Sequence, residues 1–288
     1  MSAIPAPSRI ARVAAATAAS VFLWTTRTLL GLLVMYPLLL AVEATGIVSG
    51  PDGDAVLFRP GGLLLLELLR LGLPVLGVAS RVALVLAVLA AICQLVPLGV
   101  AFDLLWFPVS PLRERWSRAS RLFSRFFGLG VITTLAQGAF LLASSLLGAA
   151  LKSALLSHDE RWASLASPLC LGLGLLACGG LGSVLDVARA ALVQEERSWR
   201  EALLHALVCL SERPYDLLLG AYPSVAAGAL AYLSALWLSA HLDLSGTSNT
   251  QIAYAFAGQQ LAVLFAIAWR VRWLGRALEL SAESRSSR

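Results

Sequence analysis

The sequence predicts an all-α, polytopic transmembrane bundle of six helices, with amphipathic helices on the cytoplasmic membrane surface. Three observations support this fold class. Hydrophobic residues make up 58% of the chain and charged residues only 14%, whereas a soluble domain usually carries about 25% charged residues. The chain contains six long, nearly uncharged stretches. Its basic residues gather on alternate connections between those stretches, as in a multi-pass membrane protein.

The six predicted spans divide the chain into a membrane domain and two short ends. The spans are residues 29–48, 82–102, 129–151, 169–185, 217–238 and 252–273. A helix of about 20 residues, rising roughly 1.5 Å per residue, covers the hydrocarbon core of a bilayer. Residues 1–28 are then a cytoplasmic N-terminal segment, residues 29–273 the transmembrane domain, and residues 274–288 a cytoplasmic tail that we expect to be frayed.

Three connecting segments have the pattern of helices that lie on the membrane rather than across it. Residues 63–73 are apolar but too short to span, so we expect an interfacial helix that ends near Pro74. In residues 103–127, arginine and aromatic residues fall on separate faces of a helix, which indicates an amphipathic surface helix. Residues 186–209 carry mixed charge, and we expect another surface helix there.

Basic residues decide the orientation of a multi-pass protein, because loops that stay in the cytoplasm are rich in Lys and Arg. One side of the predicted bundle carries both chain ends and the two long basic segments, with most of the 22 Lys and Arg residues. The other side holds only Arg59, Arg70, Arg81, Lys152 and Arg161. This imbalance predicts that both termini are cytoplasmic.

Two spans end in the same pattern, and two carry regularly spaced small residues. The sequences LGVAFD at 98–103 and LGSVLD at 181–186 each precede a basic segment, which suggests two helical hairpins of common design. Small residues recur at every fourth position as Gly174, Cys178 and Gly182, and as Gly220, Ser224 and Gly228. Such stripes let helix backbones approach closely in a bilayer. We expect a compact bundle in which the two stripes meet, although the same stripes could mediate dimerisation.

Five charged residues near the ends of apolar segments are candidates for a functional or structural role: Asp103, Asp186, Arg189, Glu43 and Glu67. Asp186 and Arg189 lie three residues apart on one helical face. They could anchor a loop or gate a path, or form only a local ion pair worth at most ~1 kcal/mol when exposed. Asp103 has the same alternatives. Placing an ionisable group within the bilayer costs at least ~2.5 kcal/mol, so Glu43 and Glu67 are candidates for a proton relay. The alternative is that water or Arg70 satisfies their carboxylates near the membrane boundary.

The sequence contains no motif for catalysis, metal binding or a cofactor. Cys93, Cys170, Cys178 and Cys209 lie in apolar runs, without the ligand spacing of a metal site. No G-x-S-x-G and no phosphate-binding loop occurs. A nucleic-acid partner would need a basic domain with aromatic residues outside the bilayer, and we expect none. The expected partners are membrane lipids and either another protein or a second copy of the chain.

Two stretches, FRPGGLLLLELLRLG at 58–72 and LDVARAALVQEERSWREAL at 185–203, resemble uncharacterised bacterial integral membrane proteins with six spans. The resemblance implies the six-span fold in the bacterial cytoplasmic (inner) membrane. It implies no activity and carries over no functional residue.

These patterns favour a non-enzymatic membrane protein, a subunit or scaffold that docks lipids or partners. A small-molecule transporter or permease component is the alternative. Pro37, Pro74 and Pro97 could break helices along a substrate path, and several glutamines lie deep in the predicted spans, namely Gln94, Gln137, Gln259 and Gln260. A third alternative, an intramembrane enzyme, requires acid, base or metal ligands supplied by distant helices.

Overall fold

The computed structural model describes residues 9–44, 63–156, 160–195, 198–241 and 249–286, and these residues are almost entirely helical. The helices are α1 (Arg9–Ala44), α2 (Leu63–Cys93), α3 (Leu95–Trp106), α4 (Leu112–Leu155), α5 (Glu160–Glu195), α6 (Trp199–Glu212), α7 (Pro214–His241) and α8 (Asn249–Ser286). The all-α fold class is therefore confirmed. Four stretches are long and apolar enough to cross a membrane: Ile10–Ala41, Gly77–Trp106, Leu112–Leu155 and Glu160–Glu195.

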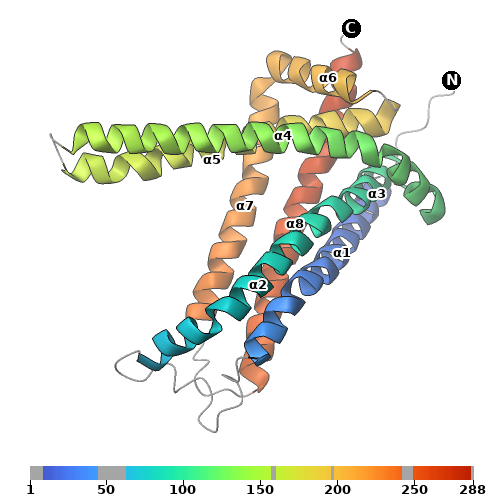
Figure 1. Ribbon diagram of the computed structural model, residues 1–288. Coiled ribbons are helices and arrows are strands. Elements are labelled where there is room, and N and C mark those ends of the chain that lie inside the picture. Colours follow the sequence, from blue (N-terminus) through green and yellow to red (C-terminus); the bar gives the residue numbers. More distant parts are fainter. Residues whose placement is uncertain (1–8, 45–62, 157–159, 196–197, 242–248, 287–288) are drawn as a thin grey trace.

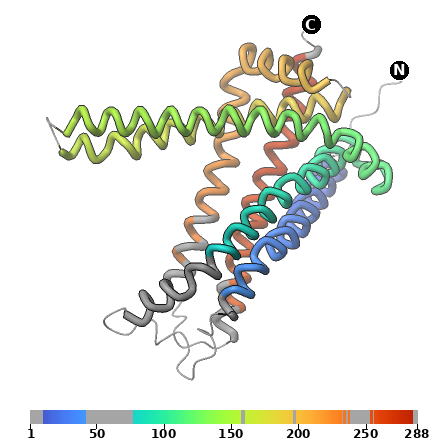
Figure 2. Tube along the Cα trace, viewed as in Figure 1, coloured from blue at the N-terminus to red at the C-terminus, as the bar shows by residue number. Residues whose placement is uncertain are grey.

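The helices form two arms that meet at one end of the molecule (Figure 1). The bundle arm consists of α1, α2, α7 and α8, which run alongside one another, and α3 prolongs α2 into the meeting point. The hairpin arm consists of α4 and α5, which lie side by side, cross the end of the bundle arm and extend away from it. Figure 2 shows this crossing along the Cα trace. The predicted third and fourth spans therefore do not join the others in a compact bundle.

The main core lies at this meeting point, here called the junction, and α5 passes through its centre. Every residue of α5 from Ser183 to Val193 is buried. The neighbours come from several helices and include Phe102 of α3, Phe126 of α4 and Leu274 of α8. A helix can be enclosed on all sides only when apolar or small residues cover most of its circumference, as in the run VARAALV. The predicted surface helix over 186–209 is thus wrong in its first half.

Outside the junction, the long helices are covered by little protein. Leu135 and Leu146 of α4, Leu173 of α5 and Leu230 of α7 are each between 63% and 70% exposed. Soluble proteins rarely display apolar surface over such a length. In a bilayer, acyl chains cover it. The distribution of exposed leucines therefore supports a multi-pass membrane protein.

Several helices run through positions where the sequence suggested breaks. α1 begins at Arg9, well before the predicted span 29–48, and part of the predicted N-terminal segment is helical. α2 continues through Pro74, so the separate interfacial helix over 63–73 is wrong. α4 joins the predicted surface helix and the predicted third span into one helix. Proline removes a single N–H donor, and neighbouring groups in a membrane protein can compensate for that loss.

The C-terminal segment is a packed helix rather than a frayed tail. α8 continues to Ser286, and Leu274, Ala277 and Leu278 are at most 2% exposed. The short α6 covers the same region, and its first turn is fixed by a capping box between Ser198 and Glu201. α6 ends at Glu212 and α7 begins at Pro214, because proline is favoured at the first position of a helix.

The small-residue stripe of α5 faces α4 and not α7. A Cβ placed on Gly174 would lie 2.8 Å from Cβ of Ser144 in α4. The Cys178 thiol donates to the carbonyl oxygen of Gln137 at 3.5 Å, and the amide of Gln137 donates in return to the carbonyl of Cys178 at 2.9 Å. Gly182 also has Gln137 as its nearest neighbour. The stripe thus holds the two helices of the hairpin arm together.

The stripe of α7 does not meet the stripe of α5. A Cβ on Gly220 would lie 2.8 Å from the ring of Trp273 in α8, and Gly228 has no neighbour within 4 Å. α5 and α7 instead meet where the Tyr222 hydroxyl donates to the carbonyl of Leu176 at 3.0 Å. The expected pairing failed because Leu-rich sequence offers several small-residue faces, and the crossing of the two arms selects among them.

Candidate functional site

The junction contains two buried aspartates, and the first is Asp186 of α5. This residue is fully buried. Its Oδ1 accepts a hydrogen bond from Arg270 at 2.7 Å, and its Oδ2 accepts one from the indole N–H of Trp273 at 2.8 Å. Both donors lie on one face of α8, three residues apart. Asp186 therefore ties the C-terminal third of α5 to the C-terminal half of α8.

Arg189 is the second arginine of the Asp186 cluster. Its terminal nitrogen lies 3.8 Å from Oδ1 of Asp186, so the predicted contact three residues apart exists at long range. One expectation was an exposed ion pair with Asp186 at the membrane boundary. Arg189 is instead buried, with only 8% of its surface exposed. Its guanidinium carbon lies 5.8 Å from the centre of the Phe126 ring in α4. Arg189 thus points into the packed interface between α4 and α5.

Asp103, near the end of α3, is the second buried aspartate. Arg118 of α4 contacts both carboxylate oxygens, with Nε 2.9 Å from Oδ1 and a terminal nitrogen donating to Oδ2 at 3.0 Å. Arg115 lies 3.8 Å away and donates to the carbonyls of Phe107 and Pro108 at 3.3 and 2.8 Å. These carbonyls follow the last turn of α3, where backbone acceptors lack helical partners. Asp103 and Arg115 therefore close the turn between α3 and α4.

The two clusters can hold helices in place, and their geometry offers little for chemistry. Both oxygens of each aspartate are occupied by donors from the chain. Removing one partner of a buried ion pair leaves the other charge unpaired, which costs up to about 3–5 kcal/mol. The clusters therefore fix α3 against α4 and α5 against α8, which sets the crossing of the two arms.

A third polar cluster, which the sequence interpretation missed, joins α6 to α8. His205 lies within 3.2 Å of the Ser284 hydroxyl and of the Ser281 carbonyl oxygen. The Cys209 thiol donates to the Ser284 hydroxyl at 3.1 Å. Gln194 of α5 donates to the carbonyl of Leu278. Helical spacing of His205 with Cys209 and of Ser281 with Ser284 was the available signal, but residues 274–288 were expected to be a tail.

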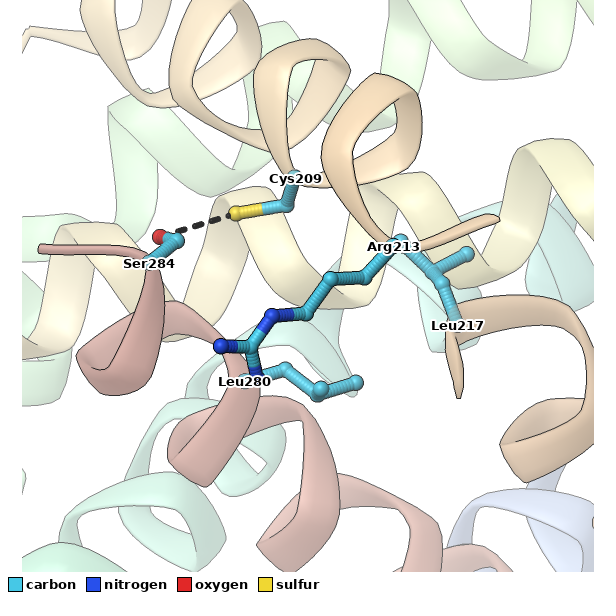
Figure 3. A pocket seen from close by; sticks show the side chains of 5 residues that line it. All are labelled: Cys209, Arg213, Leu217, Leu280 and Ser284. Carbon is cyan, nitrogen blue, oxygen red and sulfur yellow. Dashed lines mark hydrogen bonds between the residues drawn. The ribbon is translucent and has the colours of Figure 1, made fainter. Parts of the chain in front are cut away.

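A small recess lies beside this cluster, as Figure 3 shows. Its lining comprises Cys209, Arg213, Leu217, Leu280 and Ser284. Arg213 stretches across it toward α8 and forms an ion pair with Glu283. The recess has no room for a water molecule. In this conformation it is a packing contact among α6, α7 and α8.

The remaining polar candidates are distributed along the bundle arm. Glu43 lies on α1 and Glu67 on α2, but their side chains are outside the described residues. The Gln94 amide donates to the Thr26 hydroxyl at 3.5 Å, and the Thr28 hydroxyl donates to Gln260 at 3.4 Å. Within the described part of the chain, no three His, Cys, Asp or Glu side chains converge as metal ligands.

Comparison with known proteins adds no assignment: the chain matches no family model, and no curated protein or solved structure shows significant similarity to it.

Proposed function

We propose that this chain is a non-enzymatic scaffold or subunit of the bacterial cytoplasmic membrane, where it docks lipids or a partner protein between its two arms. One observation carries the proposal. Close in sequence to the contact between Tyr222 and Leu176, both arms carry uncovered large apolar side chains, including Leu175 of α5 and Val225 of α7, which are 57% and 51% exposed. A junction locked by buried ion pairs keeps this surface open to acyl chains or apolar helices.

The proposed topology has six spans and both termini in the cytoplasm. The start of α1 and the end of α8 lie at the junction, together with the basic starts of α4 and α6 (Figure 1). Both arms leave the junction and are longer than the bilayer core, and long helices fit a membrane by tilting. An impermeant thiol reagent applied to intact cells tests this topology. Ser153→Cys at the hairpin tip should react from outside, and Val109→Cys beside the junction should not. The reverse pattern, or reaction at neither site, contradicts it.

Site-specific photo-crosslinking in membranes tests the docking role. A diazirine amino acid at Leu173 or Leu230, both about two-thirds exposed, should crosslink to lipid or to one defined partner. The matched control is Ile267 of α8, which is 4% exposed and should give only crosslinks within the chain. If Leu173 and Leu230 crosslink chiefly to other parts of the chain, the arms close on each other and the docking role is wrong.

A transporter remains the second candidate, because one polar group favours it. Gln94, Thr26, Thr28 and Gln260 connect α1 to the α2–α3 break and to α8. The break lies beside Pro97, and the Gln94 side-chain oxygen is buried without a hydrogen-bond partner in the described chain. Interrupted helices line the substrate sites of many transporters. A water-filled path requires Gln94→Cys to react with a polar thiol reagent, and a protected thiol at this position would exclude such a path.

A further inference from the structure

The Asp186 cluster carries one more positive charge than negative. Arg270 and Trp273 already occupy the two oxygens of Asp186. Arg189 remains at 3.8 Å, and within the described chain it makes no hydrogen bond. Its Nε is enclosed and without a hydrogen-bond partner, as are the Nε atoms of Arg115 and Arg118 in the Asp103 cluster. Because arginine cannot lose its charge in a protein, the cluster holds a buried cation that donates no hydrogen bond within the described chain.

The Asp103 cluster has a similar surplus of arginine, which the backbone satisfies in part. It also contains two arginines for one carboxylate, but Arg115 donates to two backbone carbonyls at the end of α3. Arg189 lies within α5, six residues before the helix ends at Glu195, and the carbonyl oxygens beside it are engaged in helical hydrogen bonds. On α4 it faces the Phe126 ring and Gly130; Gly130 lies 3.7 Å from the guanidinium (measured from an added Cβ) and offers no side chain. The acceptor for Arg189 must therefore come from outside the described chain.

The chemistry of the missing acceptor follows from the donors and from their location. A guanidinium fork binds carboxylate or phosphate through two parallel hydrogen bonds. Arg270, which approaches the same oxygen of Asp186, is 41% exposed at its side chain and provides a second cation at the surface. In the proposed topology this position is the cytoplasmic boundary of the bilayer. Anionic lipid phosphates concentrate there, and basic pockets between helices bind them.

We propose that Arg189 and Arg270 bind the headgroup phosphate of an anionic membrane lipid. The inference rests on the proposed membrane topology and names one ligand of the docking role. The lipid phosphate inserts beside Gly130 and completes the charge balance of the junction. Bound lipid then stabilises the angle between the arms, because it neutralises the surplus charge where α4, α5 and α8 meet.

The test measures thermal unfolding and lipid binding of the purified full chain in a neutral detergent. Phosphatidylglycerol should raise the melting temperature of the wild type and bind at least tenfold more tightly than phosphatidylcholine. Arg189→Gln should lose that tenfold preference, yet melt higher than the wild type in lipid-free detergent, because it removes an unsatisfied buried cation. Arg200→Gln is the matched control, since Arg200 is an exposed arginine of α6 that stacks over Trp199. It should keep the preference.

Three outcomes would overturn the proposal. An equal loss of preference in Arg189→Gln and Arg200→Gln would show that only net charge matters. An equal response to inorganic phosphate would assign the site to a free anion. If Arg189→Gln does not fold, Gly130→Leu retains both arginines and should block the lipid by covering the guanidinium, and full binding by that variant would exclude the site. Photo-crosslinking at Leu173 and Leu230 is independent of Arg189. If the lipid-binding test fails but photo-crosslinking at these two positions persists, the lipid phosphate site is excluded and the docking role is retained.

Discussion

The clusters around Asp103 and Asp186 share a composition and differ in the origin of their partners. Each has a buried aspartate at the end of an L-G-x-x-apolar-D pattern and two arginines nearby. The partners of Asp103 come from the next helix, with Arg118 only 15 residues along the chain. The direct partners of Asp186 come from α8, 84 and 87 residues away. The same sequence pattern thus stabilises a local turn at Asp103 and a contact between distant helices at Asp186.

This difference teaches that the same charge pair has different consequences depending on what else satisfies it. At Asp103 the extra arginine donates to carbonyls freed by the end of α3. At Asp186 the helix continues, and the extra arginine has no such acceptor. We therefore expect the Asp186 cluster to be both the more important for stability and the more responsive to a ligand.

Removing each carboxylate should give the largest effect and should separate the two clusters. Asp186→Ala leaves Arg189 and Arg270 without a counter-charge, and we expect a loss of about 3–5 kcal/mol in unfolding free energy. Asp103→Ala should cost less, about 1.5–3 kcal/mol, because Arg115 keeps its carbonyl acceptors. Unfolding in mixed detergent micelles measures both. Equal losses would mean that the origin of the partners is irrelevant.

The indole donor is the feature of the Asp186 cluster that Asp103 lacks. Trp273→Phe keeps most of the ring and deletes the N–H that donates to Oδ2 at 2.8 Å. A hydrogen bond to a charged group contributes about 1.5–3 kcal/mol, so we expect a loss in that range. In the Asp186→Ala background the same substitution should cost clearly less. Additive losses in this double-mutant cycle would argue against a direct interaction.

Close packing of α7 supports the same clamp from the other side of Trp273. In Gly220→Ala the new methyl group would lie 2.8 Å from the indole ring, which Asp186 holds in place. Overpacking of this kind costs about 1–3 kcal/mol. Gly228→Ala is the matched control on the same helix, because nothing lies within 4 Å of it. It should cause no loss of stability, and similar melting of the two variants would contradict the close contact.

The ion pairs on the exposed face of the C-terminal part of α8 should matter least. Arg276 contacts Glu279 at 3.1 Å and Glu283 at 3.4 Å, and all three side chains are nearly half exposed. The hydrogen bond to Glu279 raises the pKa of Arg276, so this arginine stays charged at any ordinary pH. Arg276→Gln should cost at most about 0.5 kcal/mol. The difference should vanish near 1 M salt, where the Debye length is ~3 Å. A large, salt-independent loss would mean that this chain of charges is buried in the membrane-bound protein.

The sequence alone indicated much of what is local. It predicted the all-α class and the apolar character of α1, α4 and α5, since each depends on composition or on a few neighbouring residues. It also singled out Asp103, Asp186 and Arg189. It could not rank them, because burial and partners are properties of the assembled junction. The cluster of His205, Cys209 and Ser284 was missed for the same reason, since the two helices that build it are separated by α7.

By itself, then, the sequence determined that this chain forms long apolar helices with basic residues at one end, because hydropathy and charge act within single segments. Only the tertiary structure decided that α4 and α5 cross the other helices, that α8 clamps Asp186, and that Arg189 is left without an acceptor. Those outcomes depend on which of several similar helix faces meet. Leu-rich and Ala-rich faces are nearly equivalent in energy, so the few buried charges that must be paired make the choice.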